Sequence, residues 1–525
     1  MSASAAVAEE KRRGAFSSRR VFILAAIGSA VGLGNIWRFP YVAYENGGGA
    51  FVIPYLVALL TAGIPFLLLD YGIGHKFRGS PPLSFARMRR GAEGIGWWQV
   101  GICAVIAIYY AAVLAWAVRY TFFSFNKSWG AKPGDFFIGE FLQTSEPGVS
   151  ATPVAGVLIP LVVVWALVIG LLALGVQKGI GATAAVFIPI LVLSFGALVV
   201  VALFLPGAGQ GLEALFEPSW SALAEPSVWA AAFGQIFFSL SIGFGIMITY
   251  SSYVRRHTDM PGAGLVVGFS NSGFELLAGI GVFSALGFMA QDQGQEVGEV
   301  ASSGVGLAFI AFPAIINEAP AGALIGVLFF ASLVIAGLTS LISITEVVIS
   351  AVRDKFELER VAATLVVALP MALVSVLFLG TTSGLHVLDI VDHFINQFGI
   401  LLVAVVSMVV VVWGLKALPM LAAHLNDHTS VHIGLWWRAL VGVVTPLALT
   451  YVLVDSFITD VQTPYGDPTA PFPTWMLAVF GWGSALAVIV VGFVLARLRW
   501  RDEATVDGPV EERTGPTSTQ EGVQR

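Results

Sequence analysis

The chain has 525 residues, of which 57% are hydrophobic and only 11% are charged, and its formal net charge is −6. Soluble globular proteins carry roughly 25% charged residues. This composition therefore excludes an ordinary soluble protein, and it indicates that lipid surrounds most of the chain. The single cysteine, Cys103, excludes an internal disulfide bond.

Apolar stretches long enough to cross a bilayer recur along the chain. A hydrocarbon core of about 30 Å takes roughly 20 helical residues, and about twelve stretches meet that length. We place them near residues 21–44, 50–74, 97–124, 154–174, 182–205, 228–254, 262–290, 320–352, 360–380, 387–414, 434–456 and 474–498. They predict an all-α polytopic membrane protein with a single transmembrane domain at 21–498. The segment from Val305 to Ile316 is too short to cross, so we expect it against the outer mouth.

Positive charges are distributed unequally between the two sets of connecting loops. A cytoplasmic N-terminus places clusters such as Arg255 with Arg256, and Arg353 with Lys355, on one side, and leaves Lys127 on the other. Cytoplasmic loops collect Lys and Arg. We therefore expect a multi-pass protein of the cell membrane with a cytoplasmic N-terminal tail at 1–20 and a disordered cytoplasmic C-terminal tail at 499–525.

Two of the predicted spans are interrupted in comparable ways. Span one contains Gly28-Ser-Ala-Val-Gly-Leu-Gly-Asn35, and span six contains Ser239-Leu-Ser-Ile-Gly-Phe-Gly245. Non-helical backbone at membrane depth is tolerated only where it is buried or lines a cavity. Half-helix N-termini suit an anion and freed carbonyls suit a hard cation, so the paired breaks predict a polar site at the midplane. The alternative is that these glycines only allow close packing of helices.

The motifs around the breaks resemble those of the neurotransmitter:sodium symporter family. They are Gly32-Leu-Gly-Asn-Ile-Trp-Arg-Phe-Pro40, Glu45-Asn-Gly-Gly-Gly-Ala-Phe51 and Gln235-Ile-Phe-Phe-Ser-Leu-Ser-Ile-Gly-Phe-Gly245. The resemblance implies a LeuT-type fold of twelve transmembrane helices, with inverted five-helix repeats at about 21–205 and 228–414, broken helices 1 and 6, and two additional C-terminal helices. It also implies a sodium-coupled symporter that works by alternating access.

The resemblance further implies two sodium ions, each bound by oxygen ligands. The first site would be formed by Ala30, Asn35, Ser239 and Asn271 with the carboxylate of the substrate. The second would be formed by Gly28, Val31, Ala336, Thr339 and Ser340. Without the resemblance, a Thr-Ser pair in a helix is expected to bond to carbonyls of its own turn.

A mostly apolar substrate pocket follows from the same resemblance. Its lining would be Ser29, Ala30, Gly34, Ile106, Tyr110, Phe238, Ser241, Phe244, Ser340 and Ile344. Family members that carry monoamines have an aspartate at the position of Gly32, whereas amino-acid carriers have glycine there and let the substrate supply the carboxylate. Glycine and an uncharged lining therefore predict a neutral, mainly hydrophobic amino acid.

Three carboxylates lie within apolar spans, where each requires a partner. Glu275 replaces a serine of chloride-dependent family members, so we expect chloride-independent transport and allow for proton antiport through Glu275; the alternative is a permanently protonated side chain. Asp70 is expected to bond the unwound backbone of span six. Glu346 is expected to hold the cytoplasmic pathway with Tyr253.

Two charge pairs resemble the gates of the family. Arg38 and Asp392 would form the outer gate, with Asp389 as a rival for the acidic partner. Arg13 and Asp354 would form the inner gate, beside Phe16 where most relatives have tryptophan.

Other functional classes find little support in the sequence. The histidines fall at span ends or in loops, which argues against a membrane-embedded enzyme. His424, His428 and His432 repeat every four residues, but only Asp427 adds a further metal ligand. A channel or a transport-dead sensor stays open. We expect an amino acid and the lipid bilayer as partners, no nucleic acid, and a monomer or weak dimer; the preferred amino acid is left undecided.

Overall fold

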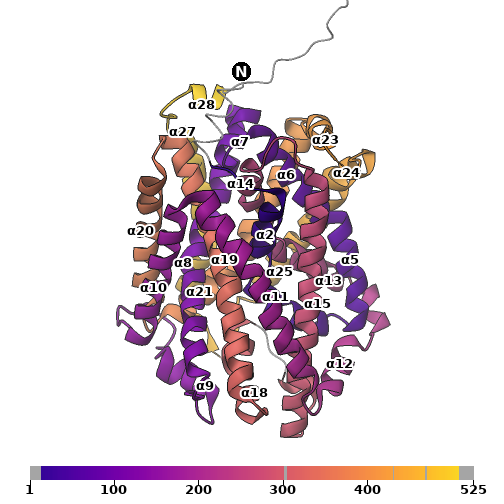
Figure 1. The fold of residues 1–525 in the computed structure, drawn as a ribbon, viewed down its shortest axis with the longest axis vertical. Helices are drawn as coiled ribbons and strands as arrows, with labels where there is room; N and C mark the ends of the chain where they lie inside the picture. Colours follow the sequence, from indigo (N-terminus) through magenta and orange to yellow (C-terminus); the bar gives the residue numbers. More distant parts are fainter. Residues whose placement is uncertain (1–13, 301–303, 430, 468–469, 508–525) are drawn as a thin grey trace, which may run out of the picture.

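The computed structural model describes residues 14–300, 304–429, 431–467 and 470–507, and these are predominantly helical (Figure 1). Ten continuous helical stretches are long and apolar enough to cross a membrane: Gly49–Phe77, Arg90–Phe123, Ala155–Ala173, Val176–Leu203, Met260–Gln293, Gly322–Phe356, Arg360–Leu379, Gly384–Gly414, Leu435–Gln462 and Thr474–Arg497. The all-α polytopic fold is thus confirmed.

Span one is broken, as the sequence predicts. Helix α2 (Arg19–Ala30) and the segment Leu33–Glu45, which comprises α3 (Leu33–Trp37) and α4 (Phe39–Glu45), together pass the same length and hydropathy test but are bent by 56° at the break. Ser18 caps α2, because its hydroxyl accepts a hydrogen bond from the Val21 amide at 3.3 Å. The break follows directly after Ala30, at the glycine-rich run.

Span six is broken more completely. It consists of α13 (Pro226–Ser239) and α14 (Ile246–Ser252), and residues 240–245 between them are not helical. Ser241, Gly243 and Gly245 have φ values of 53°, 88° and 91°. Glycine adopts positive φ values without a steric penalty. Two of these three positions are glycine, and only Ser241 has a side chain.

The long helices α8 (Glu93–Phe123), α15 (Met260–Gln293) and α19 (Gly322–Phe356) form the centre of the bundle. In each, 72% of the most apolar window is buried, compared with 33% for α10 (Ala155–Ala173) and α20 (Arg360–Leu379). Helices α8 and α19 pack along one another. The central helices therefore face protein, and the outer ones face lipid.

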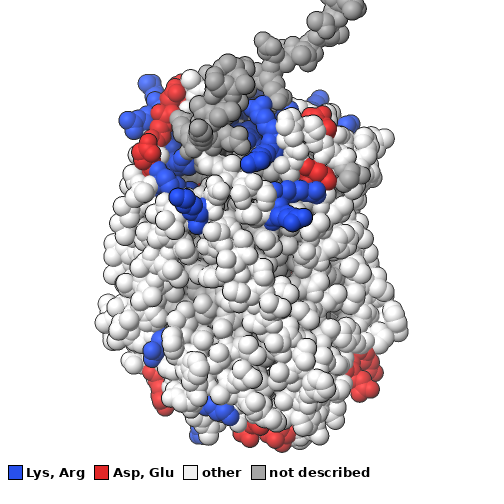
Figure 2. Space-filling model, viewed as in Figure 1, with Lys and Arg blue, Asp and Glu red and all other residues white. Residues whose placement is uncertain are grey.

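Shorter elements cover the two ends of the bundle. Helix α7 (Pro81–Met88), α23 (Leu418–Asn426) and α28 (Ala504–Asp507) lie at the upper end in Figure 1, and α12 (Ala208–Phe216) and α18 (Phe312–Glu318) at the lower end. The apolar stretch Leu307–Glu318 is too short to cross, as expected. In Figure 2, most of the visible Lys and Arg residues gather at the upper end, and the middle of that face is almost free of charge.

Part of the predicted disordered tail is instead folded against the membrane domain. Trp500 donates its indole N–H to Glu93 Oε2 at 2.9 Å, and Trp97 donates to Glu93 Oε1 at 2.9 Å. Lys355, at the end of α19, pairs with the same carboxylate at 2.5 Å and is fully buried. Trp500 thus belongs to this buried cluster, and residues 508–525 of the predicted tail lie outside the described residues.

Replacing Lys355 with Met should destabilise the fold, because it leaves the Glu93 carboxylate buried without its cation. Removing one partner of a buried ion pair lowers the free energy of unfolding by about 3–5 kcal/mol. We expect a value near the lower limit, because the two indole N–H groups still stabilise the Glu93 carboxylate. The melting temperature of purified protein in detergent measures it. The double variant Lys355→Met with Glu93→Gln is the control and should recover most of the loss, because it removes the buried charge and keeps an acceptor for the indole N–H groups. A single variant as stable as the wild type would contradict the role of the pair.

Candidate functional site

The break in span one presents its polar groups to helices α13 and α15. The Gly32 amide donates to Asn35 Oδ1 at 2.8 Å, the Asn35 amide donates to Asn271 Oδ1 at 2.9 Å, and the Asn271 amide donates to Ser239 Oγ at 3.1 Å. All three side chains are buried. The structure thus brings together three of the four residues assigned to the first sodium site, and Ala30 ends α2 beside them.

The two breaks contact one another directly. Ser241, in the non-helical part of span six, donates its hydroxyl to the Ser29 carbonyl at 2.9 Å. Ser29 also shares a hydrogen bond of 2.8 Å with Ser343 on α19. A single buried region therefore contains both interruptions, which is the arrangement that the paired glycine motifs predict.

A second set of oxygens lies between α2 and α19. The Ser340 hydroxyl is 3.4 Å from the Gly28 carbonyl, and the Thr339 hydroxyl donates to the Ala336 carbonyl at 3.0 Å. A Cβ added to Gly28 would lie 3.3 Å from Thr339 Cβ. Four of the five residues assigned to the second sodium site thus meet, and Val31 follows α2 in extended backbone. Thr339 also bonds to its own turn, as an isolated Thr-Ser pair is expected to do.

Two of the assigned substrate residues, Tyr110 and Ser340, lie against Gly32, which has no side chain. A Cβ at Gly32 would lie 3.0 Å from Ser340 Oγ and 3.2 Å from the Tyr110 hydroxyl. The Leu33 amide donates to the same tyrosine oxygen at 3.3 Å. Phe238 covers Gly34 so closely that a Cβ there would be only 2.1 Å from the ring. The remaining lining is buried: Ile106, Phe244 and Ile344 are each 5% exposed.

In the proposed outer gate, Arg38 stacks on Phe238, and the described contacts of Arg38 include no direct ion pair with Asp392. The Arg38 guanidinium lies 4.5 Å from the centre of the Phe238 ring. Asp392 accepts a hydrogen bond from Asn396 at 2.8 Å and is the carboxylate whose charge acts most strongly on Arg38. The rival, Asp389, accepts a hydrogen bond from Tyr465 at 3.0 Å instead. Asp392 is therefore the better partner for Arg38.

Glu275 is buried among neutral hydrogen-bond donors. Gln235 donates to its Oε1 atom at 2.7 Å, Tyr55 donates to Oε2, and Ser239 also bonds to the carboxyl group. Ser239 belongs to the first set of sodium-site residues as well. Sequence reasoning missed Tyr55 and Gln235 as neighbours of Glu275; Gln235 opens one of the motifs, but nothing in the sequence distinguishes Tyr55 from other membrane tyrosines.

Asp70 bonds the unwound backbone of span six, as expected. Its Oδ2 atom accepts a hydrogen bond of 3.2 Å from the Gly243 amide. The carboxylate is 1% exposed and belongs to α6 (Ile64–Phe77). Its place in an apolar span is therefore explained by a structural bond to the break.

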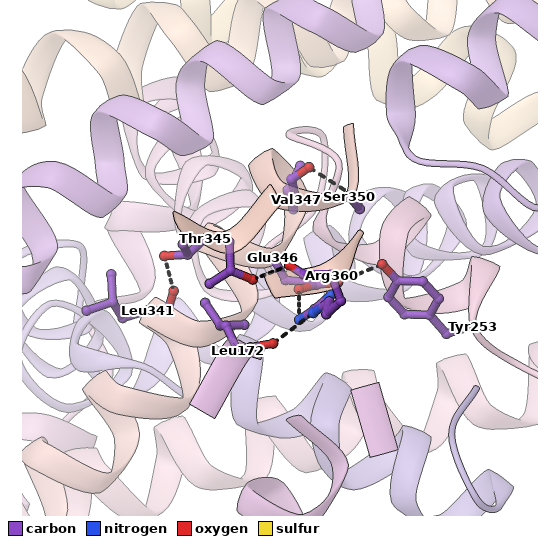
Figure 3. A network of polar contacts seen from close by, with 9 residues as sticks. Leu172, Tyr253, Leu341, Thr345, Glu346, Val347, Ser350 and Arg360 are labelled. Atoms are coloured by element: carbon purple, nitrogen blue, oxygen red, sulfur yellow. Dashed lines mark hydrogen bonds and ion pairs between the residues drawn. The ribbon is translucent and has the colours of Figure 1, made fainter. Parts of the chain in front are cut away.

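Glu346 contacts Tyr253, which confirms the expected pair, but its main partner is Arg360 (Figure 3). The Tyr253 hydroxyl donates at 2.7 Å, and Arg360 binds both carboxylate oxygens at 2.7 and 2.6 Å. Arg360 also donates to the Leu172 carbonyl at 2.7 Å. The arginine is the first residue of a predicted span, and no motif in the sequence links it to Glu346.

The inner gate is only partly within the described residues. Arg13 lies outside them, while Asp354 accepts a hydrogen bond from the Ser80 amide at 2.9 Å. Phe16 packs edge-on against Tyr250 and Tyr253, with ring centres 5.6 and 6.3 Å apart. Phe16 therefore packs on aromatic residues just before α2, whereas the predicted pairing of Arg13 with Asp354 stays a prediction.

The histidines at this end form pairs. His75 and His424 share a hydrogen bond of 3.0 Å, and His257 and His428 share one of 2.8 Å. Burial, aided by the charge of Lys76, lowers the pKa of His424 to about 4, so that it is neutral near pH 7. In the described part of the chain, no group of three or more His, Cys, Asp or Glu side chains is arranged to hold a metal ion.

Comparison with known proteins agrees with the arrangement of these helices. The profile of the sodium:neurotransmitter symporter family matches residues 13–132 and 130–503. An uncharacterized sodium-dependent transporter of Methanocaldococcus jannaschii is 40% identical over 86% of this chain and 92% of its own length. A sodium- and chloride-dependent neutral and basic amino acid transporter B(0+) of Mus musculus is 31% identical, over 92% and 85%. The sodium-dependent dopamine transporter of Bos taurus is 31% identical, over 92% and 74%. This chain therefore belongs to the sodium:neurotransmitter symporter family, whose members are transporters and not enzymes.

Proposed function

We propose that this protein imports a neutral, mainly hydrophobic amino acid with two sodium ions by alternating access, without chloride. The proposal rests on Gly32, which has no side chain and lies next to the Tyr110 hydroxyl and Ser340 Oγ. Because Gly32 has no side chain, the carboxylate at this position would come from the substrate, which implies an amino acid rather than a monoamine. Among the relatives, the transporter B(0+) is named for neutral and basic amino acids. The apolar faces of Ile106, Phe244 and Ile344 favour a hydrophobic side chain.

The two oxygen sets supply suitable sodium ligands. The first set is Ala30, Asn35, Ser239 and Asn271, and the second is Gly28, Val31, Ala336, Thr339 and Ser340. Amide, hydroxyl and carbonyl oxygens are ligands that hard cations prefer. In the first set the charge comes from the substrate carboxylate itself, which links binding of the ion to binding of the amino acid.

The expected driving force is large enough for scavenging. Two charges that cross 100 mV gain about 4.6 kcal/mol, and a tenfold sodium gradient adds roughly 1.4 kcal/mol per ion. A proton returning on Glu275 would subtract about 2.3 kcal/mol. The net coupling still favours accumulation of a dilute amino acid.

Glu275 provides the negative charge that chloride supplies elsewhere in the family. Its carboxylate shares Ser239 with the first sodium set and bonds to Tyr55 and Gln235. A fixed charge at this place removes the need for an anion, and protonation on the empty return would carry a proton outward.

The proposed orientation in the membrane rests on the distribution of Lys and Arg between the two ends of the helix bundle. Lys and Arg gather at the end that carries α7 and α28 (Figure 2), and cytoplasmic loops are enriched in these residues. We place that end, with both termini, in the cytoplasm of a cell-membrane protein that acts as a monomer or weak dimer.

Purified protein should bind neutral hydrophobic amino acids only when sodium is present, because the ion and the carboxylate complete one site. Scintillation proximity binding of twenty amino acids, in sodium and in potassium buffers, measures this. Dopamine and serotonin are the controls. Tighter binding of either monoamine than of every neutral amino acid would refute the substrate class.

Glu275→Ser should make uptake into proteoliposomes depend on chloride, since the anion would restore the missing charge. Uptake in chloride and in gluconate buffers gives the readout, and the wild type should be indifferent to the exchange. Asp70→Ser is the matched control, as it removes a buried carboxylate that bonds only the span-six break. An active Glu275→Ser protein that ignores chloride would contradict the proposal.

Gly32→Asp should abolish sodium-dependent leucine binding, because a second carboxylate would occupy the place of the substrate's own. Gly32→Ala separates steric from electrostatic effects: its Cβ meets Ser340 Oγ at 3.0 Å, so a loss on the order of tenfold, about 1.4 kcal/mol, is expected. Equal affinity of Gly32→Asp and the wild type for leucine would show that the carboxylate binds elsewhere.

A further inference from the structure

We propose that Gln99 is a positioning residue: it fixes the non-helical segment 240–245 and thereby sets the size of substrate side chain that the pocket accepts. This inference rests on the proposed function and concerns the specificity of the same site. Gln99 lies on α8, is fully buried, and donates its amide to the Gly243 carbonyl at 2.9 Å.

Gly243 is held from both sides. Its amide donates to Asp70 on α6 at 3.2 Å, and its carbonyl accepts the Gln99 hydrogen bond. One residue further on, the Phe244 carbonyl accepts a hydrogen bond from the Cys103 thiol at 3.1 Å. Non-helical backbone inside a membrane protein needs such partners, since no helix satisfies its polar groups. Two of the three bonds come from α8.

The same face of α8 carries both these anchors and the pocket lining. Gln99, Cys103, Ile106 and Tyr110 follow one another at intervals of four, three and four residues, which places them on one side of a helix. Tyr110 meets the bare surface of Gly32, where the carboxylate is proposed to bind. Phe244, which Cys103 anchors, lines the apolar part of the pocket.

The hydrogen bonds of Gln99 favour a positioning role. Because a carbonyl can only accept, the Gln99 amide nitrogen must face Gly243. Among the described residues, the Gln99 side-chain oxygen has no hydrogen-bond partner, although it is buried. It lies 3.4 Å from the place of a Cβ on Gly245. Buried polar atoms are normally hydrogen-bonded. The orientation of Gln99 satisfies the Gly243 carbonyl but leaves the Gln99 oxygen without a partner, which is consistent with a role in holding the segment.

Loss of this bond should free the segment to shift, and Phe244 with it. A hydrophobic pocket discriminates between side chains that differ by one methylene by about tenfold or more. A small displacement of Phe244 is therefore expected to change the ranking of substrates by size. Of the proposed sodium ligands only Ser239 adjoins this segment, four residues before Gly243, and the others lie on or next to α2, α3, α15 and α19. Sodium binding should therefore be affected little.

Gln99→Met keeps the shape of the side chain and removes its donor. Competition of alanine, valine, leucine, phenylalanine and tryptophan against labelled leucine, at saturating sodium, gives five affinities for each variant. We expect the tryptophan-to-alanine affinity ratio to change by about tenfold, with the half-saturating sodium concentration within about twofold of wild type. Ser407→Ala is the control, because it removes only the 3.4 Å contact of the Gln99 amide with Ser407.

A common loss of affinity for all five amino acids, or an unchanged ratio, would overturn the proposal and leave Gln99 a purely structural role. Cys103→Ala, which frees the Phe244 carbonyl, decides the question if Gln99→Met does not fold, and should change the same ratio in the same direction. Absence of any sodium-dependent binding by the wild type would instead refute the proposed function, so the two failures are distinguishable.

Discussion

The requirement that backbone polar groups be satisfied inside a membrane protein governs this structure. Two helices are interrupted near one another, and side chains from neighbouring helices replace the lost helical hydrogen bonds. Asn35 bonds the Gly32 amide, and Asp70 and Gln99 hold Gly243 from its two sides. Each partner comes from a side chain rather than from solvent, so the breaks are ordered and carry a fixed arrangement of oxygens.

The buried carboxylates follow the same logic, with different partners for different tasks. Glu93 and Glu346 each face a cation, Lys355 and Arg360, at 2.5 and 2.6 Å. Glu275 instead has only neutral direct donors, beside the first set of proposed sodium ligands. Paired carboxylates suit a structural role, whereas a carboxyl group with neutral donors suits a place beside the proposed cation sites.

Much of the fold could be predicted because it follows from local patterns. The length of the apolar stretches predicts the spans, and the glycine-rich motifs predict where two of them are broken. Asp70 could be assigned since a lone carboxylate in an apolar span must find a polar partner, and the other break was the nearest candidate. The family resemblance supplied the rest of the site, and the structure brings most of those residues together.

What the sequence could not provide was pairing across long separations. Arg360 is the first residue of a span, where a positive charge is expected to belong to a loop, yet its side chain binds Glu346. Tyr55 and Gln99 resemble any polar residue of a membrane helix until their neighbours are known. Arg38 and Asp392 were matched by charge, but whether they touch depends on Phe238, which the guanidinium covers. Trp500 fell in a polar tail, and only Glu93, far away in sequence, explains its order.

Helix α8 connects these observations. It is anchored near its start through Glu93 and Lys355 to α19, and the 11-residue interval from Gln99 to Tyr110 spans about 16 Å. The proposed carboxylate contact and the side chains that hold segment 240–245 thus lie along one helix, while most of the proposed sodium ligands lie on α2, α3, α13, α15 and α19. Because the proposed pocket contacts of α8 lie on a different element from most of the proposed sodium ligands, we expect substitutions along α8 to change the preferred substrate with little effect on sodium binding.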